Sequence, residues 1–534
     1  MLPHIADYDG LVRAFRWRVP ERYNMAHHAC DGWAARAPDR PALYRREAGA
    51  WHPVSYRALA ALSNRLAHAL AAKGVSAGDR VAILLPQSLE VLASHFAVYK
   101  LGAIAVPLAG AFGFEAIAYR LKDSGARALI TDDEGLAKLI DRPDGLGLVV
   151  CVDGPRPGAE SFAALVDAAS DRPLPVETDP DDPALMIYTS GTTGQPKGAL
   201  HGHRVLLPHV SGVSFTHDFF PQPGDRMWTP SDWAWAGGLL NTVLPALAHG
   251  VPVVVQPKGR FDPEAAFALL AEARVRNVFI PPTALKMMRA VVRPKERFGF
   301  DLRTVGTAGE ALGAQTFEWG RVALGVAVNE FYGQTECNYV IGSNAALGVA
   351  RAGATGKAVP GHEVAVIDDE GNPCPPGVMG QIAVRRPDPV MFLNYWNRPE
   401  ATSAKYLGEW LLTGDLARKD EDGYFHFLGR DDDIITSAGY RIGPAEIEDV
   451  LLRHPAVQIA AVVGKPDALR TEIVKAFLVL RPGFEPGEGL VAEIQAFVRT
   501  QLAAYEYPRE IAFVDEMPMT TTGKVIRRVL RDMD

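Results

Sequence analysis

The sequence has few cysteines, and no two of them lie close together in the chain. Cys30, Cys151, Cys337 and Cys374 are the four cysteines in 534 residues, and they form no Cys-x-x-Cys pair. This spacing offers neither a disulfide framework nor a zinc-binding pattern. A reducing compartment fits such a chain, and we expect the protein to be cytoplasmic.

Long hydrophobic runs are also missing. No window of about 18 residues, the length of a membrane-spanning helix, is free of polar or charged groups. Even the apolar stretch 81–108 contains Glu90 and Lys100. The first residues include Asp7 and Asp9 in place of the apolar core of a signal peptide. We therefore expect no membrane span and no secretory signal.

The chain has no excess of positive charge. Its formal net charge of −8 argues against a nucleic-acid-binding surface as its main function. The hydrophobic fraction of 48% and the charged fraction of 22% are ordinary for a globular protein. A chain of 534 residues exceeds what one hydrophobic core usually supports, so two or more domains are expected.

A segment rich in glycine and hydroxyl side chains is the strongest local signal. It reads Tyr188-Thr-Ser-Gly-Thr-Thr-Gly-Gln-Pro-Lys-Gly198 and follows an apolar run that predicts a buried strand. Glycine tolerates positive φ, so such a loop can turn its backbone N–H groups around an anion, and Lys197 adds a positive charge. We expect a polyphosphate ligand, with helical sequence from Val205 onward adding its N-terminal dipole.

The Walker A loop of P-loop NTPases is the nearest competing motif. It requires Gly directly before its Lys and Ser or Thr directly after it. These two positions hold Pro196 and Gly198 here. The sequence therefore disfavours a P-loop NTPase, and a plain surface turn is the other alternative.

Short apolar runs alternate with helical sequence through most of the chain. Asp262-Pro-Glu264, for example, predicts a capped helix start. The alternation predicts an α/β fold with βαβ-type subdomains around largely parallel sheets. The expected strands are 81–85, 104–108, 128–131, 148–152, 184–188, 251–255, 277–280 and 303–307.

The pattern changes near residue 430. An acidic turn at 420–423 precedes a strand-like segment at 424–428, and strands and helices then alternate to the end. This last part has enough apolar positions for a core of its own. We expect a large N-terminal domain, residues 1–430, and a small mobile C-terminal α+β domain, residues 431–534.

Five motifs, taken together, resemble those of the acyl-adenylate-forming superfamily. This superfamily contains acyl-CoA synthetases, peptide-synthetase adenylation domains and luciferases. The resemblance covers nearly the whole chain and is strongest to acetyl-CoA synthetases and medium-chain acyl-CoA synthetases. The motifs are 189–198, Glu330-Phe-Tyr-Gly-Gln-Thr-Glu336, Thr413-Gly-Asp415, 429–443 and Thr522-Gly-Lys524.

The resemblance implies a nucleotide site assembled from these motifs. Tyr332 would pack on adenine, Thr335 would hydrogen-bond the α-phosphate, and Glu336 would help to hold Mg²⁺, which prefers oxygen ligands. Asp415 would accept hydrogen bonds from the ribose hydroxyls, beside Arg430. The expected ATP- and AMP-binding residues are Thr189, Ser190, Gly191, Thr192, Thr193, Gly194, Gln195, Pro196, Lys197, Gly309, Glu310, Ala311, Glu330, Phe331, Tyr332, Gly333, Gln334, Thr335, Asp415, Arg430, Arg441 and Lys524.

The resemblance also implies a reaction in two steps. A carboxylate would attack the α-phosphorus of ATP to give an acyl-adenylate and pyrophosphate, and a thiol would then displace AMP. Lys524 would bridge the carboxylate and the α-phosphate, where negative charge concentrates. Thr189, Thr335 and Glu336 complete the expected catalytic set. The small domain would rotate between the steps about a hinge at Asp432.

CoA is the favoured thiol. The chain contains no Gly-Gly-x-Ser carrier segment. The resemblance places Ala438, Gly439, Tyr440 and Arg470 on the CoA side. Glu506 departs from the pattern, because medium-chain relatives often have Lys there, and a contact to the CoA phosphates would be lost.

The acyl pocket is expected around Trp235 and Gly333. Acetate-specific relatives carry a bulky Trp where this chain has Gly333, and each CH₂ that a longer acyl group buries contributes about 0.8 kcal/mol. We therefore expect a medium-chain, branched or aromatic acid in preference to acetate. His201 and His203 have no further ligand spacing nearby, so we interpret them as loop histidines and not as a metal site.

Two other functions stay open. An adenylation enzyme would use a carrier-protein thiol in place of CoA, and a nucleotide-binding regulator would keep the fold without turnover. Lys197, Glu336, Asp415 and Lys524 are all present, which argues against the regulator.

Overall fold

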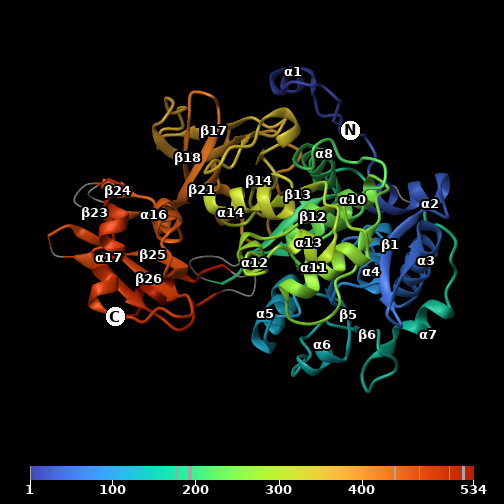
Figure 1. Cartoon of the computed structure of the whole chain (residues 1–534). Coiled ribbons are helices and arrows are strands. Elements are labelled where there is room, and N and C mark those ends of the chain that lie inside the picture. The colour runs from blue at the N-terminus through green and yellow to red at the C-terminus, as the bar shows by residue number, and fades with distance from the viewer. Residues whose placement is uncertain are drawn as a thin grey trace.

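The computed structural model describes residues 2–175, 178–189, 195–437, 440–467, 469–503, 506–519 and 524–533, without the side chain of Arg441. These residues form four β-sheets, two of them large. Figure 1 shows the large sheets in the blue-to-yellow part of the chain, with the red C-terminal part beside them.

The first large sheet has eight strands in the order β19-β9-β8-β4-β3-β5-β6-β7. From β8 to β7 all neighbours are parallel, whereas β9 and β19 add an antiparallel edge. The strands are β3 (Arg80–Leu84), β4 (Ile104–Pro107), β5 (Ala128–Thr131), β6 (Leu148–Cys151), β7 (Glu160–Ser161), β8 (Pro183–Tyr188), β9 (Gly198–Gly202) and β19 (Asn394–Tyr395).

The second large sheet has nine strands in the order β16-β15-β14-β13-β12-β10-β11-β1-β2. It is parallel from β14 to β1, and its outer strands are antiparallel. The strands are β1 (Pro41–Glu47), β2 (Ala50–Ser55), β10 (Met227–Trp228), β11 (Val253–Val254), β12 (Asn277–Phe279), β13 (Thr304–Thr307), β14 (Val328–Tyr332), β15 (Ile341–Gly342) and β16 (Lys357–Ala358).

Both large sheets are covered on their two faces. Because side chains alternate along a strand, Val81 and Ile83 of β3 enter the largest buried cluster, while Ala82 and Leu84 enter another. The helices of this region are α1 (Tyr8–Ala14), α2 (Gly32–Arg36), α3 (Tyr56–Ala72), α4 (Leu89–Lys100), α5 (Phe114–Ser124), α6 (Asp133–Ala137), α7 (Phe162–Asp167), α8 (Leu206–Thr216), α9 (Ala236–Gly238), α10 (Leu244–Ala248), α11 (Pro263–Glu272), α12 (Pro282–Met288), α13 (Pro294–Phe298) and α14 (Ala314–Trp319).

A five-stranded antiparallel sheet follows, drawn in orange in Figure 1. The predicted acidic turn 420–423 joins β21 to β22, because Lys419 pairs with Phe425. The elements are β17 (Val364–Ile367), β18 (Met379–Arg385), β20 (Tyr406–Leu407), β21 (Trp410–Lys419), β22 (Phe425–Arg430) and α15 (Pro399–Ser403).

The C-terminal part has its own sheet and its own core. Ile447 of α16, Val462 of β25 and Val498 of α17 belong to one buried cluster, whose members all come from this part of the chain. The elements are β23 (Ile435–Ser437), β24 (Tyr440–Ile442), β25 (Val457–Asp467), β26 (Thr471–Leu480), β27 (Glu510–Phe513), α16 (Pro444–Leu451), α17 (Glu488–Arg499) and α18 (Arg527–Arg531).

This architecture confirms the expected α/β fold with a large N-terminal and a smaller C-terminal part. Among the described residues, none of the helices combines the length and the apolar character that a bilayer crossing requires.

Candidate active site

The glycine-rich segment connects two antiparallel strands. Residues 190–194 lie outside the described part, but both ends of the segment are placed. Tyr188 at the end of β8 pairs with Gly198 at the start of β9. The N–H group of Thr189 donates to the Lys197 carbonyl at 2.9 Å. The chain therefore leaves and re-enters the same sheet at this loop.

The helix expected to direct its dipole at this loop does not do so. Residues 198–202, which precede it, form a strand antiparallel to β8, with Pro183 opposite Gly202. Helix α8 begins at Leu206, beyond the end of the hairpin that is distant from the loop. The prediction of a helix dipole from Val205 is wrong, because residues 198–202 form β9 and separate α8 from the loop.

Tyr395 links the loop to the second motif. The Lys197 Nζ atom lies 4.8 Å from the centroid of the Tyr395 ring. The Tyr395 hydroxyl donates to Oε1 of Glu336, which is buried. Tyr395 is placed by β19, where it pairs with Ala199 of β9. A cation from one motif and a carboxylate from another therefore contact the same aromatic side chain.

The second motif begins on β14, in the middle of the molecule. Glu330 accepts a hydrogen bond from the Thr355 hydroxyl at 3.4 Å, and burial raises the pKa of Glu330 to about 7. Phe331 is buried and stacks on Tyr339, with ring centroids 4.0 Å apart. Thr335 is half-buried at the end of the motif.

Glycine is required at position 333 for a reason other than the one that the sequence suggested. A Cβ atom at this position would lie 2.3 Å from the backbone nitrogen of Tyr339 and 2.6 Å from the Cα of Asn338. Close packing of two backbone segments therefore requires glycine here. The argument that the missing side chain leaves volume for an acyl group is wrong, since backbone already fills that space.

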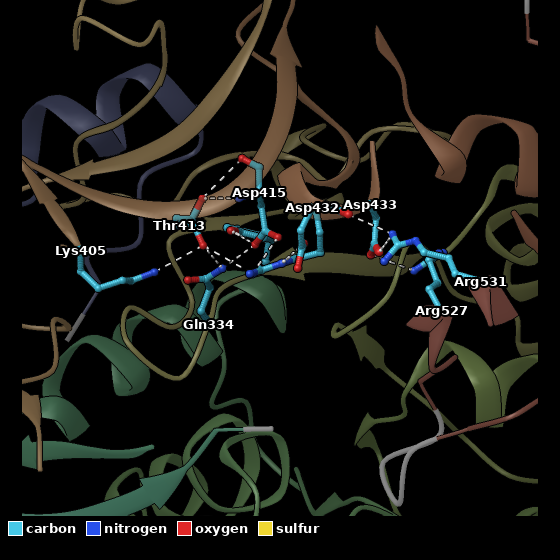
Figure 2. A network of polar contacts seen from close by, with 10 residues as sticks. Gln334, Lys405, Thr413, Asp415, Asp432, Asp433, Arg527 and Arg531 are labelled. Carbon is cyan, nitrogen blue, oxygen red and sulfur yellow. Dashed lines mark hydrogen bonds and ion pairs between the residues drawn. The ribbon is translucent and has the colours of Figure 1, made fainter. Parts of the chain in front are cut away.

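Asp415 is the centre of a network of polar contacts (Figure 2). The carboxylate is buried, and its Oδ2 accepts hydrogen bonds at 2.6 Å from both the Tyr332 hydroxyl and the Gln334 amide. Its Oδ1 lies 3.3 Å from the Arg430 guanidinium. Gln334 also donates to the Thr413 carbonyl at 2.8 Å. Three of the predicted motifs therefore meet at one carboxylate.

The predicted nucleotide-binding residues Gly309, Glu310 and Ala311 lie in the loop between β13 and α14, and Lys524 reaches this loop. Gly309 has a φ of +100°, and a Cβ atom there would lie 3.7 Å from Cε of Lys524. Glu310 accepts a hydrogen bond from the Thr283 hydroxyl at 2.9 Å. Ala311 follows in the same loop. The structure thus brings the exposed C-terminal lysine to a loop that lies more than two hundred residues earlier.

Two adjacent aspartates are held by different parts of the chain (Figure 2). The Asp432 carboxylate lies 3.5 Å from Nε of Arg430, which also pairs with Asp415. The Asp433 carboxylate contacts Arg531 at 2.5 Å and Arg527 at 3.6 Å, both on α18. The side chain of Asp432 is thereby tied to the large part of the chain, and that of Asp433 to the small part.

The other predicted site residues are more dispersed. The Trp235 ring meets Phe112 edge to face at 5.5 Å between centroids. Tyr440 is 51% exposed on β24, and Arg470 is half-buried at the turn before β26. Arg441 pairs through its backbone with Thr436. Of the predicted residues, Ser190, Gly191, Thr192, Thr193, Gly194, Ala438 and Gly439 lie outside the described part.

The two histidines after the loop are buried and not exposed. His201 lies in β9, and His203 begins the short helix after it. Burial lowers the pKa of each imidazole to about 3, so both are neutral at ordinary pH. The prediction of loop histidines is wrong, because His201 lies in a buried strand and His203 at the buried start of the short helix that follows it.

Among the described residues, one group has the spacing of metal ligands. It consists of Asp133, Cys151 and Asp153. The Asp133 carboxylate already pairs with Arg156 at 2.5 Å, and we assign no metal to it. Glu336 offers a single buried carboxylate, which suits an ion that takes its other ligands from phosphate oxygens and water.

Sequence reasoning missed Tyr395 and Lys405. The Lys405 ammonium group lies 3.4 Å from the Thr413 carbonyl, beside the Asp415 network (Figure 2). Tyr395 contacts Glu336 across 59 positions of sequence. Neither residue belongs to a motif, so only the three-dimensional arrangement connects them with the site.

Comparisons with known proteins cover almost the full chain. The family described as AMP-binding enzyme matches residues 30–396, and the AMP-binding enzyme C-terminal domain matches residues 446–524. An acetyl-coenzyme A synthetase of Bacillus subtilis (strain 168) is 34% identical over 99% of this chain and 95% of its own length. The mitochondrial acyl-coenzyme A synthetase ACSM5 of Homo sapiens is 36% identical over 97% of this chain and 92% of its own length. The crystal structure of the anthranilate CoA ligase AuaEII in complex with anthranoyl-AMP superposes with a TM-score of 0.88 at 29% identity, covering 96% of this chain and 98% of that one.

Proposed function

The chain belongs to the AMP-binding enzyme family, and from this premise we propose that it is an AMP-forming acyl-CoA synthetase. It activates a carboxylic acid with ATP to an acyl-adenylate and then transfers the acyl group to CoA. One observation carries the proposal beyond membership of the family. Lys524 lies against the Gly309 loop, while three of the other motifs meet at Asp415.

The Asp415 network is assigned to the nucleoside. Asp415 would accept hydrogen bonds from the ribose hydroxyls. Its buried carboxylate is already held by Tyr332, Gln334 and Arg430, so it is fixed in position before the ligand binds. Tyr332 would keep its ring beside adenine while its hydroxyl stays on Asp415. Gly309, Glu310 and Ala311 would line the other side of the base.

The hairpin loop is assigned to the phosphates. Residues 189–197 would offer backbone N–H groups and hydroxyls, with Lys197 as the point charge. Glu336 would hold Mg²⁺ together with phosphate oxygens, and this ion would neutralise charge on the departing pyrophosphate. Tyr395 keeps the Glu336 carboxylate oriented through its hydrogen bond.

Lys524 is assigned to the first half-reaction. The substrate carboxylate attacks the α-phosphorus in line, so negative charge gathers between the two reactants. The Lys524 ammonium group and Thr335 would stabilise that charge from opposite bodies of the protein. No covalent bond to a protein side chain is needed.

The second half-reaction requires a path for the CoA thiol. We assign residues 1–430 and 431–534 to two domains, with the pivot near Asp432. The division of contacts between Asp432 and Asp433 supports this position. Ala438, Gly439, Tyr440 and Arg470 would face CoA after rotation.

The acid is proposed to be medium-chain, branched or aromatic and not acetate. The Phe112–Trp235 pair offers an aromatic wall on which a ring or a longer chain could pack. The similarity to the anthranilate CoA ligase is compatible with an aromatic acid. Because the chain is also similar to the Bacillus subtilis acetyl-coenzyme A synthetase, acetate has to be tested as a substrate as well.

We propose a cytoplasmic location, although some relatives are named as mitochondrial.

AMP release over a panel of acids tests this function. Acetate, octanoate, a branched acid and benzoate are each incubated with ATP and Mg²⁺, with and without CoA. We expect CoA-dependent AMP release that is fastest with an acid other than acetate. AMP release that requires a carrier protein would support the adenylation enzyme, and no AMP with any acid would support the regulator.

A further inference from the structure

The loop between β13 and α14 receives two side chains from the C-terminal part of the chain. Lys524 lies next to Gly309, as described above. Asp449, on the second turn of α16, accepts a hydrogen bond through Oδ1 from the backbone N–H group of Ala314 at 3.1 Å. The two contacts lie five positions apart on one loop of the large part.

Gly313 makes the second contact possible. A Cβ atom on Gly313 would lie 2.6 Å from Oδ1 of Asp449, which is too close for any real contact. Gly313 also has a φ of +77°, a conformation in which other residues are strained. The loop therefore presents two glycines with positive φ, Gly309 and Gly313, at the two places where side chains of the C-terminal part arrive.

Charges around the contact favour a fixed Asp449. Arg453, four positions after Asp449 and just beyond the end of α16, pairs with the Asp449 carboxylate and orients it. Asp449 is close enough to Glu330 of the second motif to raise the pKa of that carboxyl, although burial is the larger cause. The contact is thus adjacent to the site and is not a remote surface interaction.

We propose that Asp449 is a positioning residue for the first half-reaction. Its hydrogen bond docks α16 on loop 308–314 and thereby holds Lys524 over Gly309, where the acid and ATP react. This inference rests on the proposed function, in which the small domain turns before acyl transfer. The Asp449–Ala314 hydrogen bond breaks in that rotation, so Asp449 has no part in thioester formation.

Two variants remove the contact from opposite sides. Asp449→Ala deletes the acceptor. Ala314→Pro deletes the donor and places the proline ring against the carboxylate, at a first helical position that accepts proline. In each variant we expect acid-dependent ATP–pyrophosphate exchange to fall about tenfold, the size expected for a lost hydrogen bond to a charged group. Acyl transfer from supplied acyl-adenylate to CoA should change by less than about twofold, because that step does not use the contact.

Three controls separate positioning from a general loss of structure. Asp449→Asn keeps an acceptor oxygen and should retain most of the exchange activity. Glu446→Ala removes an exposed carboxylate from the same helix and should leave the ratio of the two half-reactions unchanged. Arg453→Gln removes the partner that orients Asp449 and should lower exchange by less than Asp449→Ala does. Should one of the two contact variants fail to fold, the other, which alters a different part of the chain, gives the same comparison.

Equal loss of both half-reactions, or no change in either, would overturn the role of Asp449. Absence of exchange in the wild-type protein with every acid would instead overturn the proposed function. The two failures are therefore distinguishable.

Discussion

Glu330 is a carboxyl group whose burial makes stability depend on pH. Burial raises its pKa from 4.5 to about 7, so the folded chain binds a proton that the unfolded chain has already released between these values. The stability that it contributes is present below pH 4.5 and is lost as the pH rises toward 7.

Glu330→Gln should remove the decrease in stability between pH 4.5 and 7, because glutamine carries no titratable proton. We expect the variant to melt about 2–4 °C above the wild type at pH 8 and to lose that advantage near pH 4.5, as measured by thermal unfolding at a fixed scan rate. Glu421→Gln, at an exposed position in the turn after β21, is the matched control and should follow the wild-type profile. A pH-independent difference between Glu330→Gln and the wild type would contradict the assignment.

At the residue scale the sequence indicated which segments carry chemistry, but not every reason for their residues. The predicted residues Tyr332, Gln334, Asp415 and Arg430 do meet in one network. Gly333 was interpreted as leaving open space for an acyl group, yet its Cα packs against the backbone of Asn338 and Tyr339. Such a distinction depends on which backbone lies opposite, and local sequence carries no information about that.

At the scale of elements, α8 packs closely on the strand that carries the second motif. A Cβ atom on Gly212 would lie 2.6 Å from the Tyr339 ring, which stacks on Phe331 of β14. Gly212→Ala should therefore push Tyr339 toward the motif. We expect it to cost about 1–3 kcal/mol of stability, the usual cost of overpacking, and to raise the KM for ATP.

Gly489→Ala provides the matched control for this substitution. Gly489 lies in α17 and has no atom within 4 Å of a Cβ position, so alanine there should stabilise the helix slightly. Thermal unfolding and AMP-release kinetics of both variants test the expectation. Unchanged kinetics in Gly212→Ala would show that Tyr339 can move without disturbing β14.

Most elements could be predicted because their apolar periodicity is strong. The expected strand 128–131 corresponds to β5. Asp262 caps α11 as predicted, because its side chain accepts a hydrogen bond from the N–H group of Ala265. The strand β9 was not recognised, because Gly198-Ala-Leu-His-Gly202 contains two glycines and a histidine and has low strand propensity. Its pairing with β8 determines the strand, and that pairing moves α8 away from the loop.

At the scale of the whole molecule, the proposed site includes a lysine from the far end of the chain. Lys524→Ala should lower acid-dependent ATP–pyrophosphate exchange by about 10²–10³, the loss typical of a group that stabilises transition-state charge. Transfer from supplied acyl-adenylate to CoA should remain within about threefold, since AMP departure does not require this ammonium group. Arg528→Ala, on the adjacent helix, is a control for charge removal. An equal decrease in both assays would contradict the division of labour between the two half-reactions.

The contact between the C-terminal part and the loop 308–314 could not be predicted from sequence. Lys524 and Gly309 each belong to a recognisable motif, but Asp449 and Gly313 do not. Their meeting depends on how the C-terminal buried cluster is placed against the rest of the chain, and short-range sequence patterns do not determine that placement. The boundary near residue 430 stays a prediction, which the change in pattern and the separate C-terminal cluster support.

The hairpin at the glycine-rich segment has a consequence for engineering. Tyr188 and Gly198 are paired in their sheet at the two ends of the segment, and strand β9 begins directly after it. We therefore expect changes of length or sequence within residues 190–196 to alter the phosphate contacts proposed for this loop while the strand order stays the same.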